Sequence, residues 1–305
     1  MSIYRKYCAK RWSNKTIKRN LSTVTPIDSQ LYIHNTDRMA LKSLQAIPLF
    51  DKICSKLLSL MNEPQRRIID MSSKIQITED QLPNIYRMVK SICCKIGIDM
   101  PDLYLELDRE PNAYTYGTEK FSITINSGLL ECLEDDEIYA VLAHECGHIA
   151  CNHVLYLTIG DFILHGGSYG IEKIGNALSK SFVGGIVTTT IESSLELAYY
   201  HWQRCSEISA DRIATICCGS AKPVLECMMR LAGGTTHIDS EINRDLFVEQ
   251  SEKYIELTKE NKINKALEFW LTKGCTHPLL AVRAFEIQQF ANSDEFKKTL
   301  LYSRD

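Results

Sequence analysis

The chain has 305 residues, of which 45% are hydrophobic and 24% are charged, as in ordinary soluble globular proteins. Its formal net charge of -3 argues against a general nucleic-acid-binding protein, which usually carries a basic excess. The twelve cysteines include adjacent pairs at 93–94 and 217–218 but no CxxC pair. This pattern disfavours a disulfide framework, a zinc ribbon and a thioredoxin-like redox site. We expect buried free thiols in a reducing cytosol.

The first 27 residues carry seven lysines and arginines and no acidic residue. We interpret these residues as a solvated basic tail, and we assign residues 1–40 to a basic N-terminal arm. A mitochondrial transit peptide is one alternative, because such peptides are basic and poor in acids, and a contact arm for anionic partners is another. We expect no secretory signal, because no apolar segment follows the basic start.

Helical spacing of apolar residues predicts a helix over about 40–62, with a break at Pro48. A second helix is expected over 81–97, where Gly97 favours termination. The segments DLYLEL (102–107) and FSITIN (121–126) alternate apolar and polar residues, as half-buried strands do. The segment NAYTYG (112–117) lies between these two predicted strands.

Helical patterns dominate the rest of the chain. Ser127 is expected to cap a short helix, and Asp135 or Asp136 to cap a longer one that continues to Ile149. Seven glycines between 160 and 185 indicate a loose connection. Further helices are predicted over 188–218, 223–232, 241–270 and 278–291.

The predicted fold class is therefore α+β, mostly helical, with a small sheet. We divide the chain into the arm (1–40), a helical segment packing on the main domain (41–80), the main domain (81–295) and a C-terminal tail (296–305).

The segment HECGHIACNH (144–153) concentrates metal-binding side chains. In a helix, His144 and His148 lie one turn apart on the same face, so both imidazoles can approach one ion. Glu145 projects beside that ion, where its carboxylate can take a proton from water. Zinc suits imidazole ligands. The pattern predicts one catalytic zinc ion, and the alternative is a helix with surface histidines.

The other candidate side chains of this segment are expected to lie off the metal. His153 falls about 140° round an ideal helix from His148. We therefore expect it to face solvent or to bond locally rather than to join the same ion. Cys146 and Cys151 also lie off the ligand face, and we interpret them as packing residues.

A catalytic zinc ion needs a third protein ligand. The best candidate is Glu207, because Asp211 follows at i+4 on the same helical face and can orient a ligating histidine. The competing carboxylates Glu172, Glu192 and Glu196 have no aspartate at i+4.

Four stretches together resemble the M48 family of zinc metallopeptidases: LQAIPLFD, the segment from PNAYTYG to HIACNHVLY, YYHWQRCSEISADRIA and CTHPLLAVRAFEI. They occur in the family's order, and the resemblance extends over about 41–291. It implies a zincin-like metallopeptidase domain whose small β-sheet edges the active-site cleft. It also implies a peptide or protein substrate.

The resemblance gives each candidate residue a role. It implies zinc ligation by His144, His148 and Glu207, acid–base catalysis by Glu145, a supporting carboxylate at Asp211, substrate contacts at Asn112, Ala113 and Tyr114, and a position near the reaction for His277.

His277 is the candidate with the least support from spacing. Pro278 can occupy the first turn of the last predicted helix, which places His277 at the helix entrance. A histidine there can face a cleft and donate a hydrogen bond to a developing oxyanion, which is the role that the resemblance favours. The alternative is a histidine that only caps the helix or packs against it.

Membrane-bound members of the family carry transmembrane helices. The corresponding apolar runs here are VLYLTIGDFIL, interrupted by Asp161, and FVGGIVTTTI, ended by Glu192. Each has about ten residues, whereas a spanning helix needs about 20. We expect a soluble, cytoplasmic branch of the family. Mitochondrial targeting and contact of 154–191 with a membrane surface are the alternatives.

The predicted chemistry is zinc-assisted hydrolysis of a peptide bond, with Glu145 as the general base. The strand FSITIN is expected to hold an extended substrate at an exposed sheet edge. Two other functions stay open: a catalytically quiet scaffold or chaperone-like peptide-binding module that keeps zinc for stability, and a zinc hydrolase of non-peptide bonds. The pattern leaves the oligomeric state open.

Overall fold

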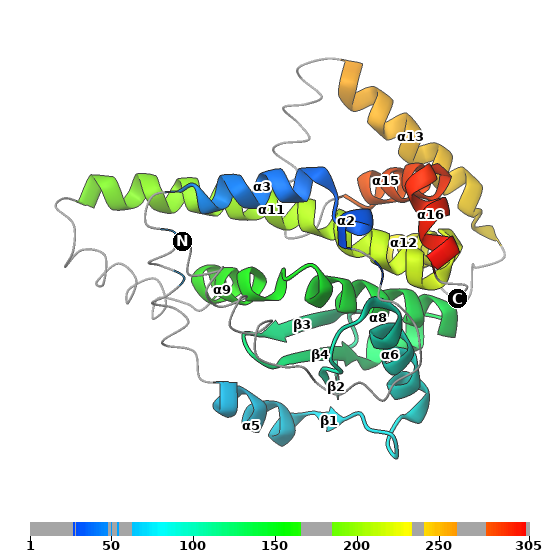
Figure 1. Cartoon of the computed structure of the whole chain (residues 1–305), viewed down its shortest axis with the longest axis horizontal. Coiled ribbons are helices and arrows are strands. Elements are labelled where there is room, and N and C mark those ends of the chain that lie inside the picture. Colours follow the sequence, from blue (N-terminus) through cyan, green and yellow to red (C-terminus); the bar gives the residue numbers. More distant parts are fainter. Residues whose placement is uncertain are drawn as a thin grey trace.

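A computed structural model describes residues 27, 29–47, 50, 54, 63–165, 185–233, 241–260 and 279–302 (Figure 1). The predicted class is confirmed, because helices surround one small mixed sheet. The strands are β1 (Ile75–Gln76), β2 (Asp102–Glu106), β3 (Ala113–Gly117) and β4 (Phe121–Asn126). The helices are α2 (Ser29–Tyr32), α3 (Asn35–Gln45), α5 (Glu63–Ser73), α6 (Pro83–Ile96), α7 (Ser127–Cys132), α8 (Asp135–Ala150), α9 (Val154–His165), α11 (Gly185–Cys218), α12 (Lys222–Gly233), α13 (Arg244–Glu260), α15 (Leu280–Asn292) and α16 (Asp294–Tyr302).

The four strands have the order β1-β2-β4-β3. Strand β4 pairs with β2 in parallel and with β3 in an antiparallel register, so both of its sides are occupied. The prediction that FSITIN forms an exposed edge is therefore wrong, because this segment is the inner strand β4. The edge strand next to β4 is β3, in the segment NAYTYG, where two tyrosines alternate with a β-branched threonine as strands favour.

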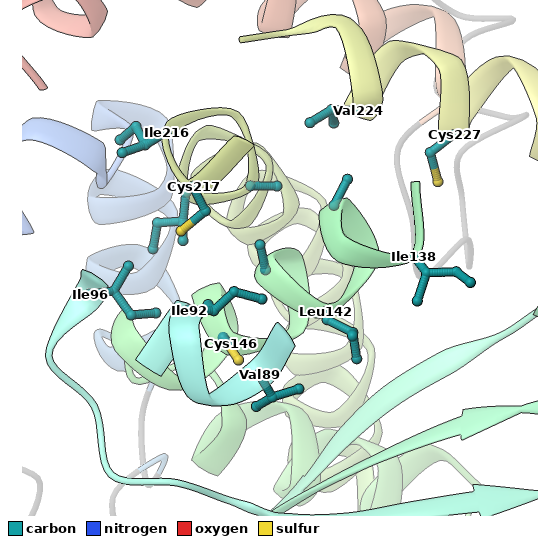
Figure 2. Packing of buried hydrophobic residues seen from close by; sticks show 14 of the residues in the cluster. Val89, Ile92, Ile96, Ile138, Leu142, Cys146, Ile216, Cys217, Val224 and Cys227 are labelled. Atoms are coloured by element: carbon teal, nitrogen blue, oxygen red, sulfur yellow. The ribbon is translucent and has the colours of Figure 1, made fainter. Parts of the chain in front are cut away.

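Helix α8 carries the HExxH segment and lies between the sheet and the long helix α11 (Figure 1). Helix α3 lies along α11, and α6 packs against α8. Figure 2 shows how α6, α8, α11 and α12 bury a common apolar cluster. Its labelled members are Val89, Ile92, Ile96, Ile138, Leu142, Cys146, Ile216, Cys217, Val224 and Cys227. This core fixes α8 against α11, the two helices that carry the candidate metal ligands.

The helix starts differ from the predicted caps by one position. Asn126, rather than Ser127, caps α7, and its side chain accepts the N–H of Leu129 at 2.9 Å. Glu134, rather than Asp135 or Asp136, precedes α8. The main-chain N–H of Glu134 donates to the Glu137 carboxylate at 2.8 Å, as in a capping box. Both predicted aspartates instead lie in the first turn, where negative charge favours a helix N-terminus.

Several predicted bounds are confirmed. Helix α6 ends before Gly97, whose φ of 73° is left-handed, and α11 spans the predicted 188–218. Helix α9 continues to His165, so the first part of the predicted glycine-rich connection is helical and the rest lies outside the described residues. Helix α3 crosses the division at residue 40 and α16 that at residue 295, and the domain division stays a prediction.

Two further findings concern the described residues taken together. The ten cysteines among the described residues are all free thiols, which agrees with the absence of a disulfide framework in that part. In the parts of the chain that the structure describes, we find no helix with the length and apolar character needed to cross a membrane.

Candidate metal centre

Two histidines of α8 and one glutamate of α11 converge in the interior. His144 Nε2 and His148 Nε2 are 3.1 Å apart. Glu207 approaches both, with Oε2 at 3.3 Å from His144 Nε2 and Oε1 at 3.2 Å from His148 Nε2. All three side chains are buried, and their ligand atoms lie within 4.8 Å of one another. This is the arrangement in which one ion can bind all three, as the sequence predicted.

A close crossing of α8 and α11 makes this convergence possible. Gly147 lies between the two histidines on α8 and faces Ala210, three residues beyond Glu207 on α11. A Cβ at Gly147 would stand 3.1 Å from Ala210 Cα and 3.2 Å from its carbonyl oxygen, tighter than ordinary van der Waals contact. The absence of a side chain at Gly147 therefore lets the backbones approach closely enough for Glu207 to reach both imidazoles.

Asp211 and Arg283 surround the outer nitrogen of His144. Asp211 Oδ1 lies 2.8 Å from His144 Nδ1, the contact that the i+4 spacing from Glu207 predicted. Arg283, from α15, donates to both oxygens of Asp211 at 2.8 and 2.7 Å. Its Nη1 also lies 3.5 Å from Glu207 Oε2. Arg283 was missed as a site residue because nothing in its local spacing connects it to α8 or α11.

The charges of this cluster favour a cation. Burial lowers the pKa of His144, but Glu207 and Asp211 outweigh burial and raise that pKa to about 10. Burial prevails at His148 and holds its pKa below the usual value. Asp211 keeps a lowered pKa despite burial because Arg283 and His144 stabilise its carboxylate. A potential that favours a proton between these groups also favours a bound metal cation.

Glu145 lies beside the three converging side chains and has a separate partner. It is 7% exposed, and its Oε2 accepts a hydrogen bond from Thr115 Oγ1 at 2.6 Å. Thr115 is on β3, so the edge strand orients this carboxylate. Sequence reasoning missed Thr115, although it belongs to the NAYTYG segment that the resemblance placed near the substrate.

The three predicted substrate-binding residues lie at the start of strand β3: Asn112 precedes it, and Ala113 and Tyr114 are its first two residues. Asn112 O accepts the N–H of Asn126 at 3.1 Å, which fixes the antiparallel register with β4. Alternation along such a ladder turns the main-chain groups of Ala113 and Thr115 away from β4, toward the outer edge of the sheet. The Tyr114 side chain points to the opposite face from Glu145, because its hydroxyl contacts Lys74 at 2.7 Å and Glu106 at 3.1 Å.

Of the two alternatives for His153, the solvent-facing one is wrong and the locally bonded one holds, because the side chain is buried against His148. Helix α8 ends at Ala150, and Asn152 then adopts a left-handed backbone with φ of 60°. This turn returns His153 to His148, whose carbonyl accepts the His153 N–H at 2.9 Å. His153 is 2% exposed, and an ideal-helix argument fails here because the residue lies beyond the helix end.

The remaining candidates divide simply. Cys146 and Cys151 are buried in the apolar core, as expected of packing residues. Glu196 is exposed on α11, outside the converging group. His277, Glu172 and the Glu192 side chain lie outside the described residues.

A helix with His-Glu-x-x-His, a facing helix that supplies a glutamate and a small sheet alongside define the zincin-like class of metallopeptidases. Comparison with known families is specific: the chain belongs to peptidase family M48, whose model matches residues 79–291. The chain is also 29% identical over 276 residues to the plastoglobule-localized metallopeptidase 48, chloroplastic, of Arabidopsis thaliana. That match covers 90% of this chain and 76% of the relative. Membership of the family makes the chain a metallopeptidase.

Proposed function

We propose that the protein is a zinc-dependent endopeptidase whose ion is held by His144, His148 and Glu207. The observation that carries this proposal is the convergence of the three buried ligand groups within 4.8 Å. Two imidazole nitrogens and one carboxylate are a donor set of catalytic zinc sites, which use three protein ligands and a fourth position for water or substrate. The surrounding potential, which raises the pKa of His144 to about 10, supports a cation there.

When bound, zinc supplies Lewis acidity, polarising the scissile carbonyl and making water a nucleophile near neutral pH. Glu145 acts as the general base that removes the proton from the attacking water. It then returns that proton to the leaving nitrogen as the peptide bond breaks. The hydrogen bond from Thr115 leaves one carboxylate oxygen, Oε1, available for this proton transfer and fixes the orientation of the carboxylate.

Strand β3 is proposed to bind the substrate in an extended conformation. The main-chain groups of Ala113 and Thr115 face the outer edge, where a peptide can pair with them, and Thr115 connects this edge to Glu145. Asn112 would anchor the start of the edge, and Tyr114 would contribute indirectly, because its main-chain groups pair with β4 and hold the edge strand in place. Beyond the Thr115 pairing position, the edge is occupied, because the Thr158 hydroxyl contacts both Gly117 N and Gly117 O at 3.2 Å.

Two further proposals do not rest on contacts in the described residues. His277 is proposed to donate a hydrogen bond to the oxyanion. A cytoplasmic location is proposed from the short apolar runs, with mitochondrial or membrane-associated locations as alternatives. The name of the plant relative, which refers to a chloroplast plastoglobule, favours the membrane-associated alternative over the mitochondrial one.

The competing function is a quiet peptide-binding module that keeps zinc for stability. The two functions differ in whether they need a general base beside the metal. A purely structural site does not need a buried, oriented carboxylate such as Glu145. The retained Glu145–Thr115 pair therefore supports the endopeptidase.

The test is mass spectrometry of the products that the zinc-loaded protein releases from a peptide library. The wild type should cut internal peptide bonds, and Glu145→Gln should release no products while retaining zinc, because the amide keeps the shape and loses the base. Glu131→Gln, an exposed position on α7, is the matched control and should cut like the wild type. Cleavage by Glu145→Gln at the wild-type rate, or no cleavage by any zinc-loaded form, would contradict the proposal.

A further inference from the structure

A line of buried polar side chains connects His148 to helix α3. The Nε2 of His148 faces Glu207, and its Nδ1 lies 3.0 Å from Nδ1 of His153. The other nitrogen of His153, Nε2, lies 2.9 Å from Asp37 Oδ2. Both His153 and Asp37 are 2% exposed. The carboxylate of Asp37 is therefore connected to the metal ligand His148 through the imidazole of His153.

Asp37 is held as a carboxylate by three donors. Besides His153, it accepts from Ser209 Oγ at 2.7 Å and from Trp202 Nε1 at 3.2 Å, both on α11. Burial alone would raise the pKa of Asp37, yet His153 and these hydrogen bonds outweigh burial and hold it below the usual value. A buried carboxylate with three donors aimed at it can only accept hydrogen bonds.

With His153 neutral, this acceptor sets the direction of each hydrogen bond in the line. Because Asp37 accepts, Nε2 of His153 carries the proton. In a neutral imidazole the other nitrogen is then an acceptor, so Nδ1 of His153 accepts from Nδ1 of His148. With its proton on Nδ1, His148 has its lone pair on Nε2, the nitrogen that faces Glu207.

We propose that His153 and Asp37 are positioning residues that lock His148 in the orientation and tautomer in which Nε2 binds the metal. This inference rests on the proposed role of His148 as a ligand. The two histidine ligands are thus supported differently: Asp211 contacts His144 directly, whereas a carboxylate on α3 supports His148 through His153. Metal-ligating histidines characteristically donate their second N–H to such a partner.

The inference makes α3 part of the metal centre. Asp37 lies upstream of residues 79–291, which the family model matches, so the family match does not cover it. Helix α3 lies along α11 (Figure 1). The main-chain N–H of His34, just before α3, donates to Ser209 Oγ at 3.0 Å. Ser209 and Glu207 are both on α11, so these contacts hold Asp37 at a fixed place relative to Glu207.

The main test is the zinc affinity of full-length variants, measured by competition with a chromophoric chelator. His153→Phe keeps a ring of similar size and removes both nitrogens. It should weaken zinc binding about 10- to 100-fold, as loss of partners behind a ligand does. Asp37→Asn should weaken it less. If the two residues act in one line, the double variant should bind zinc no more weakly than His153→Phe alone.

Tyr156→Phe is the matched control for a purely structural role. It removes the hydroxyl that accepts from Gln45 Nε2 at 2.8 Å and disturbs the buried aromatic cluster around Trp202, but the line from Asp37 to His148 does not include Tyr156. It should lower the melting temperature, and because it leaves the partners of His148 in place, its zinc affinity should stay within about twofold of the wild type. Equal losses of affinity in Tyr156→Phe and His153→Phe would overturn the positioning role.

His148→Ala, measured in the same assay, separates this inference from the proposed function. It should lose zinc binding. If His148→Ala kept zinc, the proposed ligand set and the positioning role would both fail. If His148→Ala lost zinc but His153→Phe bound it like the wild type, the positioning role alone would fail.

A second measurement uses the wild type and so does not depend on a variant folding. Histidine ¹H–¹⁵N correlation spectra of the zinc-loaded protein should show protons on Nδ1 of His148 and on Nε2 of His153. The signals are assigned to His153 by their loss in the spectrum of His153→Phe. If that variant does not fold, the signals that disappear in His148→Ala assign His148 instead. A proton on Nδ1 of His153 with none on its Nε2 would overturn the inference.

Discussion

At the scale of single residues, Asp211 makes two kinds of contact with different consequences. It contacts Nδ1 of His144, and it pairs with both donors of the Arg283 side chain that face it. A buried arginine without a carboxylate partner is costly, because the charge has left water without compensation. Asp211 therefore connects the orientation of a metal ligand to the stability of the packed helices.

Asp211→Asn tests this double role. The amide can accept only through one oxygen, so zinc affinity should fall about 10- to 100-fold. The melting temperature should fall as well, because Arg283 then faces a neutral partner. The exposed Asp294→Asn is the control and should leave zinc affinity unchanged. Wild-type zinc affinity in folded Asp211→Asn would remove Asp211 from the metal centre.

Some of these site residues can be predicted from the sequence and others cannot, for a physical reason. His144 and His148 follow helical spacing, and so do Glu207 and Asp211, so the shared face of each pair could be predicted from i and i+4 positions. Contacts between distant segments have no such spacing. Thr115, Arg283 and Asp37 reach the centre from a strand and two other helices, and only the folded arrangement brings them there.

At the scale of elements, the crossing of α8 and α11 determines whether the ligands can meet. Figure 2 shows the apolar cluster that presses α6, α8, α11 and α12 together. The bounds of α6 and α11 were predictable because apolar periodicity and a terminal glycine mark them. Strand β3 was missed because its residues, AYTYG, lack the alternation of aliphatic and polar side chains that marks DLYLEL and FSITIN. The return of His153 was missed because Asn152, not a glycine, makes the left-handed turn.

Gly147→Ala tests the crossing, because two effects predict opposite results. In an isolated helix the change would stabilise by about 0.5–1 kcal/mol. Here the new methyl group would meet the backbone of Ala210 at 3.1–3.2 Å, and backbone cannot swing aside as a flexible side chain can. We expect overpacking to win, with a loss of about 1–3 kcal/mol in the free energy of unfolding and weaker zinc binding. Denaturant unfolding measures the first and chelator competition the second. A more stable protein with unchanged zinc affinity would contradict the close crossing.

At the scale of the whole molecule, the metal should connect parts of the fold that are far apart in sequence. The proposed ligands come from α8 and α11, Arg283 comes from α15, and α3 approaches through Asp37. An ion that binds this folded centre but not the unfolded chain stabilises the fold by mass action, by about 4 kcal/mol at a free concentration of 1,000 times Kd.

Chelation should therefore lower the melting temperature of the wild type. At about 2–4 °C per kcal/mol for a protein of this size class, the expected drop is roughly 10 °C. Calorimetric scans with and without chelator measure it, and zinc added back should restore the higher value. Glu207→Ala should melt at the same temperature with and without chelator. A chelator-dependent shift of equal size in Glu207→Ala would mean that the stabilising ion binds elsewhere.

The central claim is that α8 and α11 together hold one metal ion through His144, His148 and Glu207. It is tested most directly by the zinc content of purified, folded protein, measured by elemental analysis for the wild type, Glu207→Ala and Glu196→Ala. Both glutamates are on α11, but Glu196 is exposed, whereas Glu207 is 1% exposed and contacts both histidines. We predict about one zinc ion per chain in the wild type and in Glu196→Ala, and far less in Glu207→Ala. A folded Glu207→Ala protein with the wild-type zinc content would contradict the account.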